Sequence, residues 1–177
     1  SQPKSVAVNP VTNQIYVANN NSANVTVIDG ATNATTTVSA AGKPNSVAVN
    51  PVTNKIYVAN TSSDNVTVID GSNNNTTTVA VGGFQSSPVS IAVNTVTNKI
   101  YVPNSGNNNV TVIDGSNNST TTVTARSGSD AVAVNAVTNT IYVANANTHN
   151  VTVIDGATNA TTTVAAARPV WLWSDRE

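Results

Sequence analysis

The chain has 177 residues, a length suited to one domain, and carries a net charge of −1 with charged side chains at only 8% of positions. Such a surface lacks the clustered Lys and Arg that bind a nucleic-acid backbone or anionic lipid, so we expect no nucleic-acid partner. The sequence has no cysteine, which excludes disulfides and thiolate metal sites, and no apolar run is long enough for a membrane-spanning helix, so we expect no membrane insertion.

The first predicted strand covers residues 5–8, an apolar run too short and too β-branched for a helix. Residues 9–13 (Asn-Pro-Val-Thr-Asn) then read as a hairpin turn, in which Asn13 takes the left-handed conformation. Later copies of this segment vary at the proline position but keep the closing residue as Asn54, Asn98 and Asn139. The pattern therefore predicts the same turn four times.

Three further strands follow in the same unit. Residues 14–18 and 25–28 carry β-branched or aromatic side chains on both faces, as expected of a sheet packed between two neighbours. Residues 35–38 are the most polar of the four runs, so we place this strand outermost. Small alanines in the first strand indicate close packing of neighbouring units at a common axis.

The unit recurs along the chain. Ile-Tyr-Val begins at residues 15, 56, 100 and 141, and Val-Thr-Val-Ile-Asp-Gly recurs at the same intervals of 41, 44 and 41 residues. A period in the low forties with several short strands is typical of a β-propeller blade. We therefore predict an all-β propeller over residues 1–167, with four blades of four antiparallel strands at about 3–43, 44–87, 88–129 and 130–167. A three-residue insertion around 82–87 is expected in a surface loop between blades, and residues 168–177 form a non-repeat tail.

The repeat resembles that of the YVTN β-propeller family of bacterial and archaeal surface and exported proteins. The matching segments are Asn-Pro-Val-Thr-Asn-Lys-Ile-Tyr-Val-Ala-Asn at 50–60 and Val-Thr-Val-Ile-Asp-Gly at 66–71, repeated through residues 3–165. The sequence departs from the family where the eponymous Thr is replaced, at Ala18, Ala59, Pro103 and Ala144. Family members typically have seven blades, so four blades form a closed four-bladed ring, half of an eight-bladed dimer, or part of a longer protein.

One acidic residue recurs in every unit, as Asp29, Asp70, Asp114 and Asp155. Calcium needs six or more oxygen ligands, usually from several carboxylates, whereas each of these turns offers one Asp among Asn, Ser and Thr. We expect a structural role instead, in which the carboxylate accepts backbone N–H groups of an Asx-type turn. No metal site and no cofactor are predicted.

Two columns of Asn-x-Ser/Thr sequons are also retained in all four units. They are Asn24, Asn65, Asn109 and Asn150 before the third strand, and Asn33, Asn74, Asn118 and Asn159 in the turn before the fourth. Both columns are expected in exposed loops, which makes these eight residues candidates for N-glycosylation. The alternative is that copying of an Asn- and Thr-rich repeat produced the sequons without a function.

We expect a non-enzymatic structural, self-assembling or protein-interaction module. His149 is the only histidine and Glu177 the only glutamate, so no triad or transition-metal cluster is available and no catalytic residue is predicted. One alternative is a carbohydrate-binding propeller, with a glycan stacked on the repeated tyrosines and bonded by Asn and Asp. A less favoured alternative is a propeller enzyme, because some related propellers are lyases or lactonases.

The surface composition and the C-terminal tail bear on where the protein is found and on how it assembles. A surface rich in Asn, Thr and Ser, and a chain that starts without Met, lead us to expect an exported or cell-surface protein, cut from a signal peptide or taken from a trimmed sequence. The tail carries Trp171, Leu172 and Trp173, an aromatic cluster typical of interfaces. We expect it to support a homo-oligomer, as a dimer or filament, although docking of the tail between blades 4 and 1 is an equal alternative. A glycan or surface protein is a further expected partner.

Overall fold

The computed structural model describes residues 1–166, and these contain strands and turns without a helix. Sixteen strands form four sheets of four, and in each sheet the antiparallel strands follow one another in chain order. The first two sheets are blade 1, with β1 (Pro3–Asn9), β2 (Gln14–Asn19), β3 (Asn24–Asp29) and β4 (Thr35–Ser39), and blade 2, with β5 (Pro44–Asn50), β6 (Lys55–Asn60), β7 (Asn65–Asp70) and β8 (Thr76–Ala80).

The remaining sheets repeat this arrangement. Blade 3 contains β9 (Ala92–Asn94), β10 (Lys99–Asn104), β11 (Asn109–Asp114) and β12 (Thr120–Thr124), and blade 4 contains β13 (Ser129–Asn135), β14 (Thr140–Asn145), β15 (Asn150–Asp155) and β16 (Thr161–Ala165). The predicted all-β propeller architecture with four four-stranded blades is confirmed. β13 begins one residue before the boundary expected for the fourth blade.

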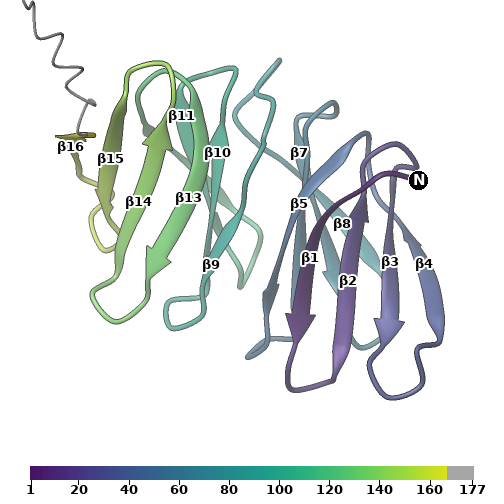
Figure 1. The fold of residues 1–177 in the computed structure, drawn as a ribbon. Coiled ribbons are helices and arrows are strands. Elements are labelled where there is room, and N and C mark those ends of the chain that lie inside the picture. The colour runs from purple at the N-terminus through teal and green to yellow at the C-terminus, as the bar shows by residue number, and fades with distance from the viewer. Residues whose placement is uncertain (167–177) are drawn as a thin grey trace, which may run out of the picture.

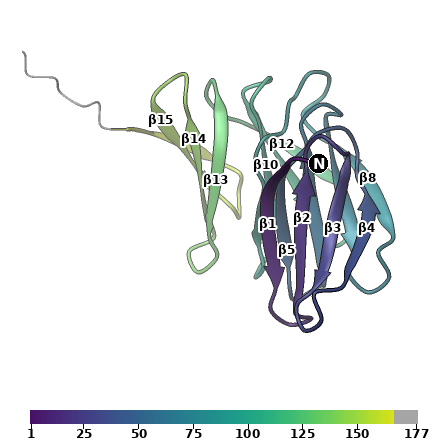
Figure 2. The ribbon, with the colours of Figure 1, turned by 45° about the vertical axis from the view of Figure 1, so that its right-hand side comes forward.

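The four sheets stand side by side with their first strands toward the middle and their fourth strands outside (Figure 1). β4, β8 and β12 each bury a single valine and expose their other residues, as the polar sequence of this strand predicts. Blades 1 and 4 lie at opposite ends of an open arc, as the second view also shows (Figure 2). Within residues 1–166, the four blades therefore do not close into a ring.

The hairpin between the first and second strands follows the predicted turn chemistry. Asn13, Asn54, Asn98 and Asn139 all have positive φ, between 51° and 53°. Asparagine tolerates this left-handed region better than most residues because its short amide can bond locally. The turn type therefore comes directly from the repeated sequence.

The three-residue insertion lies in the loop around residues 82–87, between β8 and β9. Asp64 holds this loop, because its carboxylate oxygens accept the N–H groups of Gln85 at 2.8 Å and Ser87 at 3.0 Å. The insertion displaces the start of the first strand of blade 3, so that β9 has only three residues and Pro88 forms an isolated bridge with Asn104.

The hydrophobic core lies between the blades, in one cluster per interface. We call the two packing surfaces of a blade its Tyr face and its Ile face. In blade 1 the Tyr face consists of Tyr16, Ala18, Val25, Val27 and Val38, and it packs on the Ile face of blade 2, which consists of Val47, Ile56, Val58 and Ile69. Equivalent residues form the interfaces between blades 2 and 3 and between blades 3 and 4. Each blade therefore needs a neighbour on both faces to bury its apolar residues.

The described residues include no helix that is long and apolar enough to cross a membrane.

Candidate functional site

The repeated aspartates cap the turn between the third and fourth strands. The Asp29 carboxylate accepts the N–H groups of Ala31 and Thr32, both at 2.9 Å. Asp155 makes the same pair of bonds with Ala157 and Thr158, at 2.8 and 3.1 Å. In both turns these backbone bonds hold the pKa of the carboxyl below its ordinary value, because they stabilise its charged form. The geometry is that of an Asx turn.

In the two middle blades the equivalent carboxylate also accepts a hydrogen bond from a lysine. The Lys55 ammonium donates to Asp70 at 2.7 Å, and Lys99 donates to Asp114 at 3.2 Å. The bond from Lys55 is the main cause of the lowered pKa of Asp70, whereas Ser116 contributes most at Asp114 and brings its pKa to about 2. Among residues 1–166, no three His, Cys, Asp or Glu side chains gather closely enough to hold a metal ion.

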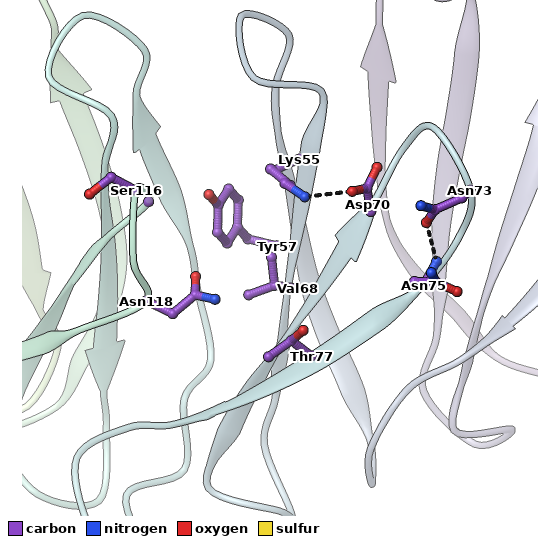
Figure 3. A pocket seen from close by; sticks show the side chains of 10 residues that line it. Lys55, Tyr57, Val68, Asp70, Asn73, Asn75, Thr77, Ser116 and Asn118 are labelled. Carbon is purple, nitrogen blue, oxygen red and sulfur yellow. Dashed lines mark hydrogen bonds and ion pairs between the residues drawn. The ribbon is translucent and has the colours of Figure 1, made fainter.

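A polar pocket of about 250 Å³ opens where blade 2 meets the turn of blade 3 (Figure 3). Blade 2 lines it with the Lys55–Asp70 pair, the ring of Tyr57 and polar residues of the β7–β8 turn, and blade 3 adds Ser116 and Asn118. The Tyr57 hydroxyl is buried and has no hydrogen-bond partner among the described residues. Burial, aided by the charge of Asp114, raises its pKa to about 12, so this hydroxyl is a donor at neutral pH.

The repeated tyrosines do not present their rings as stacking surfaces inside the arc. Tyr16, Tyr57 and Tyr101 are all 0% exposed because the Ile face of the next blade covers them. Tyr142 occupies the same position in blade 4 and is 43% exposed. Among the tyrosines of the described blades, Tyr142 alone is therefore exposed enough to stack on a sugar ring.

The sequons lie closer to the blade interfaces than we expected. Asn33 is exposed, and the other seven candidate residues are half-buried. In the first column the Asn24 side-chain carbonyl accepts from Asn19 at 2.9 Å, and blades 2 and 3 repeat this bond. In the second column Asn118 lies beside Tyr57 of the preceding blade, in the lining of the polar pocket. The first column is therefore half-buried in every blade, whereas in the second column Asn33 of blade 1 is exposed. N-glycosylation of these residues stays a prediction.

A series of hydrogen bonds between asparagines of neighbouring blades was not predicted from the sequence. The Asn9 amide donates to the Asn54 carbonyl of blade 2 at 2.8 Å, and the same bond joins Asn50 to Asn98 at 2.8 Å and Asn94 to Asn139 at 2.9 Å. Each donor also caps its own turn, as Asn9 does by accepting the N–H of Val11 at 3.0 Å. The available signal was that both positions are asparagine in all four units.

The end blades each leave one packing face open. On the Ile face of blade 1, Val6 is 63% exposed, whereas its equivalent Val47 in blade 2 is 6% exposed. On the Tyr face of blade 4, Val164 is 55% exposed, whereas its equivalent Val38 in blade 1 is 5% exposed. The arc therefore ends in two apolar surfaces of opposite type.

Two sequence features remain outside these sites. The tail residues Trp171, Leu172 and Trp173 lie outside the described residues. His149 is exposed in the turn before β15, where it has a φ of 52° in a position that is Ala23, Asp64 or Asn108 in the other blades.

The chain is similar to solved β-propeller structures. They include a hydrazine synthase from Kuenenia stuttgartiensis (24% identity, TM-score 0.80, covering 92% of this chain and 48% of that one). A streptogramin B lyase matches with 9% identity and a TM-score of 0.81 over 93% of this chain and 55% of the other, and U3-55K with 12% identity and 0.80 over 94% and 53%. The chain thus spans about half the length of these structures. No protein-family model matches it, and no curated protein does.

Proposed function

We propose that this chain is a non-enzymatic, exported or cell-surface β-propeller of the YVTN type that acts as a structural, self-assembling module. The observation that carries the proposal is the pair of open apolar faces at the ends of the arc, on Val6 and Tyr142. Apolar surface of this kind on a soluble blade marks an interaction site. The recurring asparagines support this role, since Asn9 and its equivalents cap their own turns and donate to the next blade.

The proposal is tested by the mass of the purified chain in solution. Light scattering after size-exclusion chromatography, over a concentration series, should give masses at multiples of 18.0 kDa. Fractionation of the source cells, with an antibody against the chain, should recover it from the surface or the medium. A monomer at every concentration contradicts self-assembly, and recovery from the cytoplasm alone contradicts export.

A second candidate function is carbohydrate binding, which the pocket between blades 2 and 3 favours. Its lining offers an ammonium, a carboxylate and side-chain amides, which suit the hydroxyl groups of a sugar. A glycan array should then show saturable binding that Lys55→Ala abolishes, with Lys4→Ala at an exposed site of blade 1 as the control. An array without a saturable ligand would exclude this function.

A further inference from the structure

We infer that the Tyr face of blade 4 binds the Ile face of blade 1 in a second copy of this chain, head to tail, in the register of the internal blade interfaces. The inference rests on the proposed function and specifies its partner, its orientation and its contacts. The three internal interfaces supply the template, because each of them joins a Tyr face to the Ile face that follows it.

The apolar residues of the two open faces match this template. Tyr142 stands where Tyr16 packs on Val47 and its neighbours in the interface between blades 1 and 2. Val6 stands on blade 1 where Val47 stands on blade 2, and Ile15 where Ile56 stands. Contact between the two faces would remove these side chains from water just as it does inside the chain. The gain is the same transfer of apolar area that stabilises the internal interfaces.

The hydrogen bonds between asparagines of neighbouring blades define the register expected of the contact between copies. Its three internal donors, Asn9, Asn50 and Asn94, are buried, whereas the fourth, Asn135, is exposed on blade 4. Asn135 still caps its own turn, where it accepts the N–H of Val137 at 3.1 Å. The acceptor that corresponds to Asn54 is Asn13, which is exposed on blade 1. One unused donor and one unused acceptor therefore lie on the two faces that the inference brings together.

One polar contact differs from the template. Thr61 donates to the Pro88 carbonyl at 2.8 Å, and Ser105 donates to Asp130 at 3.1 Å, each across a blade interface. The same position in blade 4 is Ala146, which has no side-chain donor. We therefore expect the contact between copies to be weaker than the internal ones and to depend on concentration.

The partner is a second copy because the ends of one arc do not meet. Blades 1 and 4 stand at opposite ends of the four sheets (Figure 2). The propeller structures to which this chain is similar are about twice its length, since it covers 48% to 55% of them. Two copies supply eight blades, so a head-to-tail pair provides both missing neighbours. A contact that joins unlike faces either closes into a ring or continues as a filament.

Cysteine cross-linking tests the register directly, because the sequence has no cysteine of its own. Asn13→Cys and Asn135→Cys proteins, mixed and oxidised, should form a disulfide-linked dimer, and neither protein alone should do so. The matched control is Asn94→Cys with Asn139→Cys in one chain, whose side chains already meet at 2.9 Å and should link within the chain. Val137→Cys, in an exposed turn, replaces Asn135→Cys as the control for random collision.

A substitution on the Ile face of blade 1 tests how much this face contributes to the affinity between copies. Val6→Asp on blade 1 should raise the dissociation constant by at least about tenfold, because the equivalent Val47 is 6% exposed and burial would leave the new carboxylate unpaired. Val11→Asp on the same blade is the matched control, since Val11 is 74% exposed and its equivalents Val52 and Val96 stay 74% and 75% exposed between blades. Equal effects of the two substitutions would overturn the inference.

The outcomes separate this inference from the proposed function. A wild-type chain that stays monomeric overturns both. A chain that assembles while the mixed cysteine proteins fail to link overturns the head-to-tail register and leaves self-assembly standing. Linkage within a single chain that carries both Asn13→Cys and Asn135→Cys would show a closed four-bladed ring and overturn the second copy. A disulfide-linked dimer or ladder from that chain supports the inference.

Discussion

At the scale of single residues, asparagine does much of the work that charged residues do elsewhere. It closes the left-handed turn at Asn13, caps the turn at Asn9 and bridges the second and third strands at Asn19, where the amide donates to Asn24 and Thr26 at 2.9 Å. These roles need a short side chain with both a donor and an acceptor. A chain with few charges can therefore still satisfy its buried polar groups.

The turn before the third strand contains a position where asparagine is missing. Ala23 has a φ of 48°, and its equivalent in blade 3 is Asn108, with a φ of 55°. A left-handed conformation costs an ordinary L-residue roughly 1–2 kcal/mol, and asparagine loses less. We expect Ala23→Asn to raise the free energy of unfolding by about 1 kcal/mol, measured by urea denaturation. Ala31→Asn, in an exposed turn without positive φ, is the control and should change little.

Because the Tyr57 hydroxyl is buried, we expect the protein to lose stability at alkaline pH. Burial raises its pKa to about 12, and an unfolded tyrosine titrates near pH 10. The unfolded chain therefore releases the proton first, so the stabilisation is complete below about pH 10 and is lost as the pH rises toward about 12. Urea denaturation at pH 9 and pH 11.5 should show a smaller loss for Tyr57→Phe than for wild type. A loss of equal size in both proteins would show that other groups cause it.

At the scale of elements, the inter-blade asparagine bond couples neighbouring sheets. Asn50 is buried, donates to Asn98 at 2.8 Å and accepts the N–H of Val52 at 3.1 Å. Asn50→Ala should lower the free energy of unfolding by about 2 kcal/mol, because it leaves buried groups unpaired. Asn135→Ala is the matched control at low concentration, since it removes only the turn bond. If the two losses are equal, the bond between blades contributes nothing.

The strands and turns could be predicted from the sequence because their signals are local and repeat four times. The recurring Asn13 position specifies the left-handed turn, and the polar residues 35–38 identify the outer strand. The pairing of Asn9 with Asn54 could not be predicted, because the two lie 45 residues apart and a repeat does not say which blade contacts which. For the same reason, the burial of Asn118 depends on a neighbouring blade that its own sequon does not reveal.

At the scale of the whole molecule, all the contacts inferred between copies lie within residues 1–166. We therefore expect deletion of residues 168–177 to leave the mass distribution in solution unchanged. If the tryptophans of the tail form the interface instead, the deletion should abolish assembly. Light scattering of the truncated and full chains at matched concentrations decides between the two, because a truncated chain that is only monomeric would assign assembly to the tail.

Asn33 offers a way to control assembly from a single site. Its equivalents Asn74, Asn118 and Asn159 are half-buried, with Asn118 beside Tyr57 of the preceding blade. Only Asn33 in this column is exposed, since no blade precedes blade 1 within residues 1–166. Head-to-tail contact would cover Asn33 with the blade 4 of another copy. A glycan on this sequon would occupy the volume that the partner needs. The modification and the assembly should therefore exclude each other.

A chemical substitute for the glycan makes this measurable in any host. Asn33→Cys labelled with a polyethylene glycol maleimide should be monomeric by light scattering, whereas the unlabelled variant should assemble. Val11→Cys with the same label should still assemble, because this position stays exposed between blades, as its equivalents Val52 and Val96 show. Assembly that persists with a labelled Asn33→Cys would mean that the face of blade 1 is not the contact. Loss of assembly only at residue 33 would place the partner on that face.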